Sequence, residues 1–519
     1  MRHPLARRAA VLLCASPLLV SALTAPRLAA AATLMVGPGK AFAKPCAALA
    51  VAQDNDIIEI DARGDYAGDV CMIGQNGLTL RGSGGRAKLD AQGENFGGKG
   101  IWVITGRDTT VENLEFTGAS VPDKNGAGIR QEGDNLTVRH CYFHDNENGI
   151  LTGASAQSQI TVEYSEFANN GFGDGYSHNM YIGNVARFTL RYSYSHDSKV
   201  GHLVKSRAAE NVIAYNRLSS EQGSTSYELD LPNGGRAFVI GNLIEQGANS
   251  ENPSLLSYAL EDAPPGNPKY ELYVINNTFV NDRPNGGTFV NISTNVADPA
   301  LLQNNIFAGP GTVTNQGNAL NINNYSGADP LFTSRSAFDY TLQAKSPCID
   351  QGSAPDPSLV NGTALAPAWE YVHPANARER LGVGPIDIGA HEFGTGNSAG
   401  GGSNVGGVGG VGSSRAGGSG STSAGAASLP GGASNGGEVS SSASGSASTS
   451  GSETESGCAC RASGVGPAGS ARWLALLVSA AALVRRRHRL ASVNTVSRCV
   501  ARGTTTDAER RPQRASGTV

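Results

Sequence analysis

The chain of 519 residues contains 68 glycines, only 6 % aromatic residues and 16 % charged residues, and its formal net charge is -4. This slightly acidic balance, without a dense basic stripe in the central region, argues against a nucleic-acid partner. Abundant glycine, few aromatic residues and the lack of a long amphipathic helical pattern favour an all-β or solenoid body over a helical one.

The first 32 residues have the pattern of a secretory signal peptide. Arg2, Arg7 and Arg8 precede an apolar run, and small residues follow at Leu28 to Ala32. A basic start, an apolar centre and a small-residue cleavage site are the three parts of such a signal. We therefore expect residues 1–32 to be removed and the remainder to be exported.

Export would place the body of the chain in an oxidising compartment, where disulfides persist. Cys46 and Cys71 are the natural pair, because they flank one β-like unit near the start of the mature chain. Cys141 falls at an inward repeat position and is expected as a buried free thiol, whereas Cys348 has no evident partner. The sequence alone does not fix the connectivity.

Beyond the signal, the pattern predicts a short strand, a helix over about residues 45–52 and a strand over residues 56–61. The helix begins with proline and has an alanine-rich body, both of which favour it. The end of a β-solenoid exposes backbone groups and apolar core, so an element must cover it. We expect this helix to be the N-terminal cap.

A short segment then recurs through the central region at intervals of about 23 to 28 residues, with one longer step. A period in this range indicates a solenoid, in which each unit buries its apolar face only against its neighbours. The aligned segments begin at Val111, Val138, Val162, Leu190, Ile213, Val239, Val274 and Leu302.

Two positions of this segment predict ladders. Asparagine tolerates a left-handed bend, and its amide can bond to the same amide one coil away, whereas phenylalanine suits an interior stack. The fourth position is asparagine in the later coils, at Asn216, Asn242, Asn277 and Asn305. The sixth position is repeatedly phenylalanine, at Phe116, Phe143, Phe167, Phe279 and Phe307.

With these repeats the chain resembles the right-handed parallel β-helix proteins of the pectate-lyase-like class, over residues 33–310 and less regularly to 393. Its opening VGPGK and its closing PIDIGAHEF are similar to those of many secreted bacterial β-helix proteins. The resemblance implies an all-β solenoid with a short capping helix, but not one activity, because the fold hosts lyases, hydrolases, epimerases and adhesins. Residues 311–393 are expected to form irregular C-terminal coils and a cap, ending in a strand over residues 387–393.

The C-terminal part predicts a tethered display. Residues 394–457 are nearly all small and polar, as in a flexible linker. Residues 458–490 resemble the myxobacterial C-terminal sorting signal, with a cysteine motif, an apolar stretch and the cluster Arg485 to Arg487. This resemblance implies attachment at the cell surface, with contact to the membrane only through that segment. The polar tail, residues 491–519, departs from the pattern of such signals.

Chemistry is expected where side chains of successive coils stack about 4.8 Å apart on one outer face. We align the second strand of each coil over residues 128–132, 149–153, 179–183, 201–205 and 226–230. Alternation along the strands predicts an inward set: Met180, Ile182, Val204, Tyr227 and Leu229. It predicts an outward set: Arg130, Tyr181, Lys205, Glu228 and Asp230.

A uronate polysaccharide could lie along such a face. Lyase or C5-epimerase chemistry needs a cation for the sugar carboxylate, a base for the neighbouring proton and an acid. The candidates are Arg207 or Arg130 as cation, Lys205 or His202 as base, and Tyr181 or His178 as acid. The candidate substrate contacts are Arg130, Asn179, Tyr227, Glu228 and Asp230. The last two carboxylates could instead position the base or hold a Ca²⁺.

Plainer interpretations stay open. Lys205 and Asp230 could form an ordinary surface ion pair of small energetic value. The histidines could be satisfied edge residues and the tyrosines ladder packing. Lyases of the chondroitinase-B-like and alginate-lyase type pair a lysine with an arginine about one coil later, yet here that position is near Ser226 and holds no arginine.

We therefore predict a secreted, surface-displayed, monomeric β-helix protein acting on acidic polysaccharide, as a uronate lyase or C5-epimerase. The alternative is a non-catalytic carbohydrate-binding or adhesive surface solenoid. No dinucleotide or phosphate-loop fingerprint in a βα context indicates a nucleotide cofactor.

Overall fold

The computed structural model describes residues 31–261 and 267–394. The predicted linker, sorting segment and polar tail, and almost all of the predicted signal peptide, lie outside these residues. Within the described ranges, no helix is long and apolar enough to cross a membrane.

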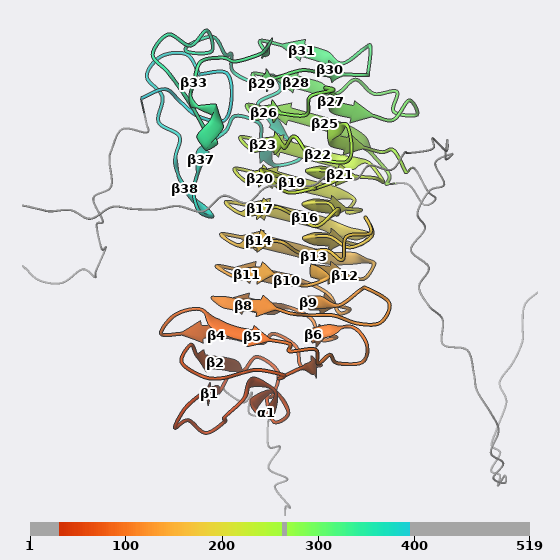
Figure 1. Cartoon of the computed structure of the whole chain (residues 1–519), viewed down its shortest axis with the longest axis vertical. Coiled ribbons are helices and arrows are strands. Elements are labelled where there is room, and N and C mark those ends of the chain that lie inside the picture. The colour runs from red at the N-terminus through yellow and green to blue at the C-terminus, as the bar shows by residue number, and fades with distance from the viewer. Residues whose placement is uncertain (1–30, 262–266, 395–519) are drawn as a thin grey trace, which may run out of the picture. The chain divides into compact units, whose positions relative to one another are not determined.

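The described chain is a right-handed parallel β-helix, as the repeats predict (Figure 1). From β4 to β30, each coil contributes one strand to each of three parallel sheets, A, C and B in chain order. Because successive strands pair in parallel, every coil covers the apolar face of its neighbour.

Sheet A consists of β1 (Thr33–Val36), β2 (Ile57–Asp61), β4 (Thr79–Ser83), β7 (Thr109–Glu112), β10 (Leu136–Arg139), β13 (Ser155–Glu163), β16 (Val185–Arg191), β19 (Glu210–Ala214), β22 (Gly235–Ile240), β25 (Tyr270–Ile275), β28 (Leu301–Gln303) and β31 (Leu320–Ile322). Sheet C consists of β5 (Ala87–Asp90), β8 (Leu114–Thr117), β11 (Tyr142–His144), β14 (Glu166–Ala168), β17 (Tyr194–His196), β20 (Arg217–Ser219), β23 (Leu243–Gln246), β26 (Thr278–Asn281), β29 (Ile306–Ala308) and β32 (Tyr325–Gly327). Sheet B consists of β3 (Cys71–Ile73), β6 (Gly100–Ile104), β9 (Ala127–Gln131), β12 (Asn148–Thr152), β15 (Met180–Ile182), β18 (Val204–Ser206), β21 (Leu229–Leu231), β24 (Ser254–Tyr258), β27 (Thr288–Ile292) and β30 (Thr312–Thr314).

The predicted phenylalanine stack is confirmed inside the coils. Phe143 stacks between Phe116 and Phe167, with ring centroids 4.8 and 4.9 Å apart. Phe279 and Phe307 stack at 5.2 Å farther along. All five rings are fully buried, so the stack is part of the main core.

The asparagine ladder is also confirmed, at the bend between sheets A and C. The Oδ1 atom of Asn242 accepts hydrogen bonds from the backbone N–H and the side-chain amide of Asn216, at 2.9 and 3.0 Å. Asn277 and Asn305 repeat this arrangement. One expectation is wrong: the left-handed backbone belongs to the residue before each ladder asparagine, such as Tyr215 with φ of 59°.

The N-terminal cap forms as predicted. Helix α1 (Pro45–Leu49) lies at the N-terminal end of the solenoid and buries Ala48 and Leu49 (Figure 1). The disulfide between Cys46 and Cys71 links α1 to β3, with a Cα–Cα distance of 5.8 Å. The other two cysteines of the described chain, Cys141 and Cys348, are buried free thiols.

The C-terminal region differs from the expectation. The β-helix continues to β32, beyond residue 310, and residues 387–393 form no strand. Residues 328–394 do not cap the end but pack sideways, where Tyr340 and Tyr371 join a cluster with outer residues of sheet C. Figure 1 shows these elements beside the later coils. They are β33 (Phe332–Ser334), the 3-10 helix η1 (Arg335–Ala337), β34 (Asp339–Leu342), β35 (Leu359–Val360), β36 (Thr363–Ala364), β37 (Trp369–Val372) and β38 (Asn376–Glu379).

Candidate functional site

The outer face of sheet B carries a column of side chains from successive coils. Strand pairing places Leu151 beside Tyr181, Tyr181 beside Lys205, and Lys205 beside Asp230. The predicted pairing of β15 with β18 is shifted by two residues from the observed pairing. Because side chains alternate with a period of two, the error leaves the predicted faces unchanged. Met180, Ile182, Val204 and Leu229 are inward and fully buried, as predicted.

Lys205 lies at the centre of a buried ionic cluster. Its Nζ atom is 3.2 Å from Oδ2 of Asp230 and 2.7 Å from Oε1 of Glu261. The lysine is only 7 % exposed and Asp230 only 3 %, so the surface ion pair considered above does not describe them. Burial opposes the charge on Lys205, but the two carboxylates outweigh it and raise the pKa of the lysine. Lys205 is therefore protonated at neutral pH.

Arg207 completes the cationic side of the cluster. Its Nε atom donates to the Tyr181 hydroxyl at 2.8 Å, and Nη1 donates to Oδ1 of Asn233 at 2.5 Å. Its Nη2 atom binds Oε2 of Glu261. The Glu261 carboxylate thus bridges Lys205 and Arg207, one oxygen to each.

Two neighbouring histidines border the cluster, with their rings tilted by 34° to each other. The rings of His178 and His202 are 4.5 Å apart, and the His202 backbone N–H donates to Nδ1 of His178 at 3.1 Å. Nδ1 of His202 is 3.3 Å from Oδ2 of Asp230. Burial lowers the pKa of both histidines, and the charge of Lys205 lowers it further. Both imidazoles are therefore neutral near neutral pH, and the Asp230 carboxylate favours the proton of His202 on Nδ1.

The structure does not bring every predicted residue to this cluster. Arg130 lies two coils before Tyr181, separated from it by Leu151, and its Nε atom is 3.6 Å from Oε1 of Glu132. Tyr227 was predicted to point inward, which is wrong: it is partly exposed and meets the His202 ring edge-on at 5.0 Å. It precedes β21, where strand alternation does not yet apply.

The expectation that Asn179 contacts the substrate is also wrong. Its side chain is fully buried, where Oδ1 accepts from the amide of Asn170 at 2.9 Å and Nδ2 donates to Oγ of Ser195 at 3.0 Å. An amide whose oxygen and nitrogen are both engaged in the interior cannot contact a polysaccharide on the outside. Its role is structural, at the bend between sheets C and B.

The predicted outward direction of Glu228 is wrong as well. It is fully buried, and it accepts hydrogen bonds from Ser220 Oγ at 2.7 Å and from Gln246 Nε2 at 3.2 Å. Burial raises its pKa well above the ordinary range, and the nearby Glu245 adds to the rise. Glu228 therefore neither faces the outer surface nor supports Asp230.

The expected Ca²⁺ site does not fit these residues. Glu228 is turned into the core, while the Asp230 carboxylate faces the ammonium group of Lys205 and the ring of His202. A cation there would meet the positive charge of Lys205 directly. Nor do the described residues contain a group of three or more histidine, cysteine, aspartate or glutamate side chains able to hold a metal ion.

The buried glutamate beside Glu228 gives a testable pH dependence. Burial raises the pKa of Glu245 to about 7, although Ser219 Oγ and the Glu221 backbone N–H donate to its carboxylate. Between about pH 4.5 and 7 the folded chain keeps a proton that the unfolded chain has lost. Stability should therefore fall as pH rises through this window, and Glu245 contributes about 3 kcal/mol of the fall.

Urea unfolding at a series of pH values measures this slope. Glu245→Gln should make the slope shallower, because glutamine keeps the shape and an acceptor oxygen but does not titrate, whereas Glu228, whose pKa burial also raises, still contributes. The exposed Glu94→Gln should leave it unchanged. An equal slope in Glu245→Gln and wild type would contradict the assignment.

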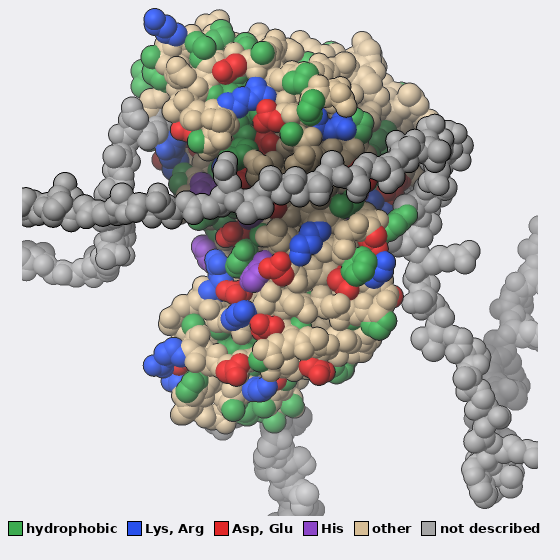
Figure 2. Space-filling model, viewed as in Figure 1, with side chains coloured by type: hydrophobic (Ala, Val, Ile, Leu, Met, Phe, Trp, Pro, Cys, Tyr) green, Lys and Arg blue, Asp and Glu red, His purple; other side chains and the backbone are tan. Residues whose placement is uncertain are grey.

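Exposed charge pairs elsewhere differ from the Lys205 cluster. Figure 2 shows acidic and basic side chains intermixed on the visible face. On sheet A, Arg139 pairs with Glu112 at 3.5 Å, and their side chains are 42 % and 34 % exposed. Such pairs contribute little stability, so burial distinguishes the Lys205 cluster from them.

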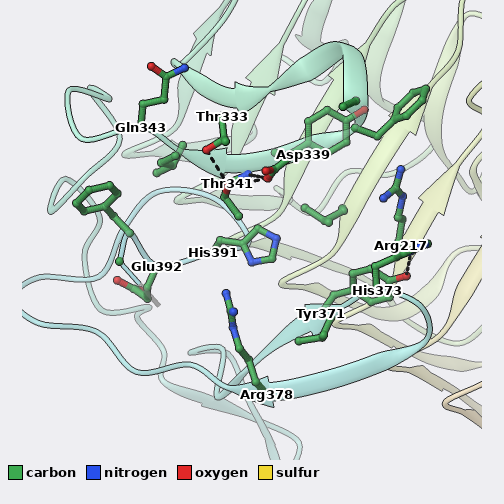
Figure 3. A pocket seen from close by; sticks show the side chains of 18 of the residues that line it. Arg217, Thr333, Asp339, Thr341, Gln343, Tyr371, His373, Arg378, His391 and Glu392 are labelled. Atoms are coloured by element: carbon green, nitrogen blue, oxygen red, sulfur yellow. Dashed lines mark hydrogen bonds between the residues drawn. The ribbon is translucent and has the colours of Figure 1, made fainter. Parts of the chain in front are cut away.

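A separate cavity of about 790 Å³ lies between the C-terminal elements and the outer face of sheet C (Figure 3). Arg217, His373 and His391 line it, and Figure 3 shows the His391 ring near its centre. Arg217 pairs with Glu221 at 2.8 Å, and the Tyr371 hydroxyl is 3.1 Å from Nδ1 of His373. This cavity shares no lining residue with the Lys205 cluster.

Comparisons with known proteins concern the fold. A family model described as right handed beta helix region matches residues 76–244. No curated protein matches the chain. Among solved structures, the pectate lyase Pel9A is similar with 15 % identity and a TM-score of 0.43, over 67 % of this chain and 90 % of that chain.

Two further structures are similar at lower scores. An alginate lyase from Paenibacillus sp. str. FPU-7 has 14 % identity and a TM-score of 0.34, over 57 % of this chain and 99 % of its own. A pectin methylesterase in complex with hexasaccharide VII has 13 % identity and a TM-score of 0.26, over 59 % and 94 %. At such identities the likeness extends to the β-helix fold alone.

Proposed function

We propose that this protein acts on an acidic polysaccharide by removing the proton next to a uronate carboxylate, as uronate lyases and C5-epimerases do. One observation carries the proposal. Lys205 and Arg207 bind a single carboxylate between them, beside the neutral imidazole of His202. These are the cations and the base that the reaction needs, carried by β18 and the residues next to it in one coil.

The cation pair would make the substrate acidic. A uronate carboxylate bound by two positive charges withdraws electrons from the adjacent carbon and stabilises the negative charge that develops when its proton leaves. Both cations are largely buried, so their field is screened less than that of exposed side chains.

His202 is a better base than Lys205. The lysine is held protonated by Asp230 and Glu261, whereas burial keeps the histidine neutral. With its proton on Nδ1, facing Asp230, the imidazole offers Nε2 to the substrate. Asp230 thus acts as the positioning residue of the base.

Tyr181 is the better candidate for the acid. Its hydroxyl accepts the Nε–H of Arg207, which leaves the phenolic proton available to a substrate oxygen. His178 is neutral and its Nδ1 already accepts the His202 backbone N–H, so it is poorly suited to donate a proton. Protonation of the glycosidic oxygen would give elimination, and protonation of the opposite sugar face would give epimerisation.

The internal pairing of Lys205 and Arg207 also suits the alternative, a non-catalytic surface solenoid that binds carbohydrate, because paired charges need no substrate to be stable. For either function we propose export and cell-surface display, on the strength of the sequence patterns in residues 1–32 and 458–490.

The full chain should be incubated in D₂O with polygalacturonate, alginate and a glycosaminoglycan. Ultraviolet absorbance detects the double bond of an unsaturated uronate, and mass spectrometry detects deuterium at C5. A double bond identifies a lyase, and deuterium without a double bond identifies an epimerase. Binding with neither product would contradict proton abstraction and leave the non-catalytic solenoid.

A further inference from the structure

The partner that bridges Lys205 and Arg207 comes from outside the three sheets. Glu261 follows β24, and its backbone N–H donates to the carbonyl of Pro232 at 3.0 Å. Its side chain is 28 % exposed, against 8 % for Lys205 and 15 % for Arg207. The carboxylate therefore reaches the cations from the solvent side, the direction from which a ligand would arrive.

We propose that Glu261 occupies the subsite for the substrate carboxylate, as an internal ligand that a uronate must displace. The inference rests on the proposed function for the identity of the ligand and adds the residue that sets affinity and selectivity. Glu261 Oε1 and Oε2 each take one cation, which is the arrangement a uronate carboxylate would adopt.

The cluster can release Glu261 while each cation keeps other hydrogen-bond or ion-pair partners. Lys205 keeps Asp230 at 3.2 Å, and Arg207 keeps the Tyr181 hydroxyl and Asn233. Among the described residues, the hydrogen bonds to the Glu261 side chain come from the two cations. Because both cations keep other partners, displacing Glu261 costs less free energy than displacing a group that is a cation's sole partner.

Asp230 is the contrasting case in the same cluster. It is 3 % exposed, accepts from Ser257 Oγ at 2.8 Å and faces both Lys205 and His202. It belongs to a central strand, so it cannot move away without breaking the sheet. Asp230 is the permanent counter-charge, and Glu261 is the exchangeable one.

Charge explains the selectivity that follows. Lys205, Arg207 and Asp230 together carry one net positive charge, which Glu261 neutralises. A uronate replaces that negative charge and restores neutrality, whereas an uncharged sugar leaves two buried cations with one carboxylate. Glu261 therefore makes binding conditional on a carboxylate in the ligand.

The competition lowers the apparent affinity for uronates. A ligand that binds only when Glu261 has left is weakened by the fraction of molecules in which it has left. Glu261→Gln removes the competing charge while keeping the size of the side chain. We expect it to bind galacturonate and mannuronate about tenfold more tightly, a factor equivalent to about 1.4 kcal/mol.

Titration calorimetry on the full chain tests this, with galacturonate and mannuronate as ligands and galactose and mannose as their uncharged counterparts. Glu251→Gln, at an exposed glutamate just before β24, is the matched control and should behave as wild type. Lys205→Met in the Glu261→Gln background should lose the gain. Should Glu261→Gln fail to fold, Glu261→Asp, too short to span both cations, should show the same gain.

Unchanged or weaker uronate binding in Glu261→Gln and Glu261→Asp would overturn the inference, as would an equal gain for galactose. The proposed function fails separately. Tighter uronate binding without double-bond formation or deuterium uptake would leave the carboxylate subsite standing and remove the chemistry. Product formation without tighter binding would leave the proposed chemistry standing and remove the role of Glu261 in the carboxylate subsite.

Discussion

His202→Ala is expected to lower the rate of uronate proton abstraction by a factor of about 10² to 10⁴, the usual contribution of a positioned general base. The loss should fall on kcat with little change in KM, because Lys205 and Arg207, which bind the carboxylate, remain in place. The backbone N–H that donates to His178 remains as well, and Asp230 keeps Lys205 and Ser257. The variant should therefore fold.

The matched control is His144→Ala. His144 also lies on an outer face between carboxylates, with Nδ1 2.9 Å from Asp145 and Nε2 3.2 Å from Glu115, but it belongs to sheet C. It should leave the rate unchanged. Initial rates measured against substrate concentration separate kcat from KM, and circular dichroism checks the fold.

The pH profile adds a second readout. Because burial lowers the pKa of His202, activity should persist below the ordinary titration range of histidine and be lost only at lower pH. Full activity in His202→Ala would contradict the assignment of His202 as the base.

Asn242→Ala is expected to destabilise the fold by about 3 to 6 kcal/mol. Oδ1 of Asn242 accepts the backbone N–H and the side-chain amide of Asn216, and Nδ2 donates to the Ile213 carbonyl at 2.8 Å and to Asn277. Alanine leaves several of these buried groups without a partner, each at a cost of about 1 to 3 kcal/mol. Because coils are stable only through their neighbours, a break in mid-ladder weakens both sides.

Urea unfolding followed by circular dichroism measures the loss. Asn318→Ala is the control, because its Nδ2 bonds to the Ala297 carbonyl at the exposed surface, and it should cost less than about 0.5 kcal/mol. Equal stability of the two variants would show that the ladder is dispensable.

The sequence predicts the periodic part of this protein well. A repeat with the length of one coil, with asparagine and phenylalanine at fixed positions, is sufficient to predict the solenoid and both ladders. Alternation with a period of two predicts the outward direction of Tyr181, Lys205 and Asp230 even with the alignment two residues out.

The same reasoning fails where the pattern stops. Tyr227 and Glu228 precede β21, and outside the strand the alternation no longer dictates direction, so Glu228 turns into the core. The wrong prediction for Asn179 has the same cause. This residue lies at a bend before β15, where its amide completes interior hydrogen bonds. At these positions the hydrogen-bonding needs of the neighbouring coils decided the outcome.

By itself, then, the sequence determined the coil, its ladders and the outer face on which Tyr181, Lys205 and Asp230 stand, because each depends on contacts between adjacent repeats. Only the tertiary structure brought Glu261 to Lys205, 56 residues away, and laid residues 328–394 along the side of the solenoid. These contacts join aperiodic segments to distant coils. No repeat encodes them, because they depend on where the chain packs once the solenoid has formed.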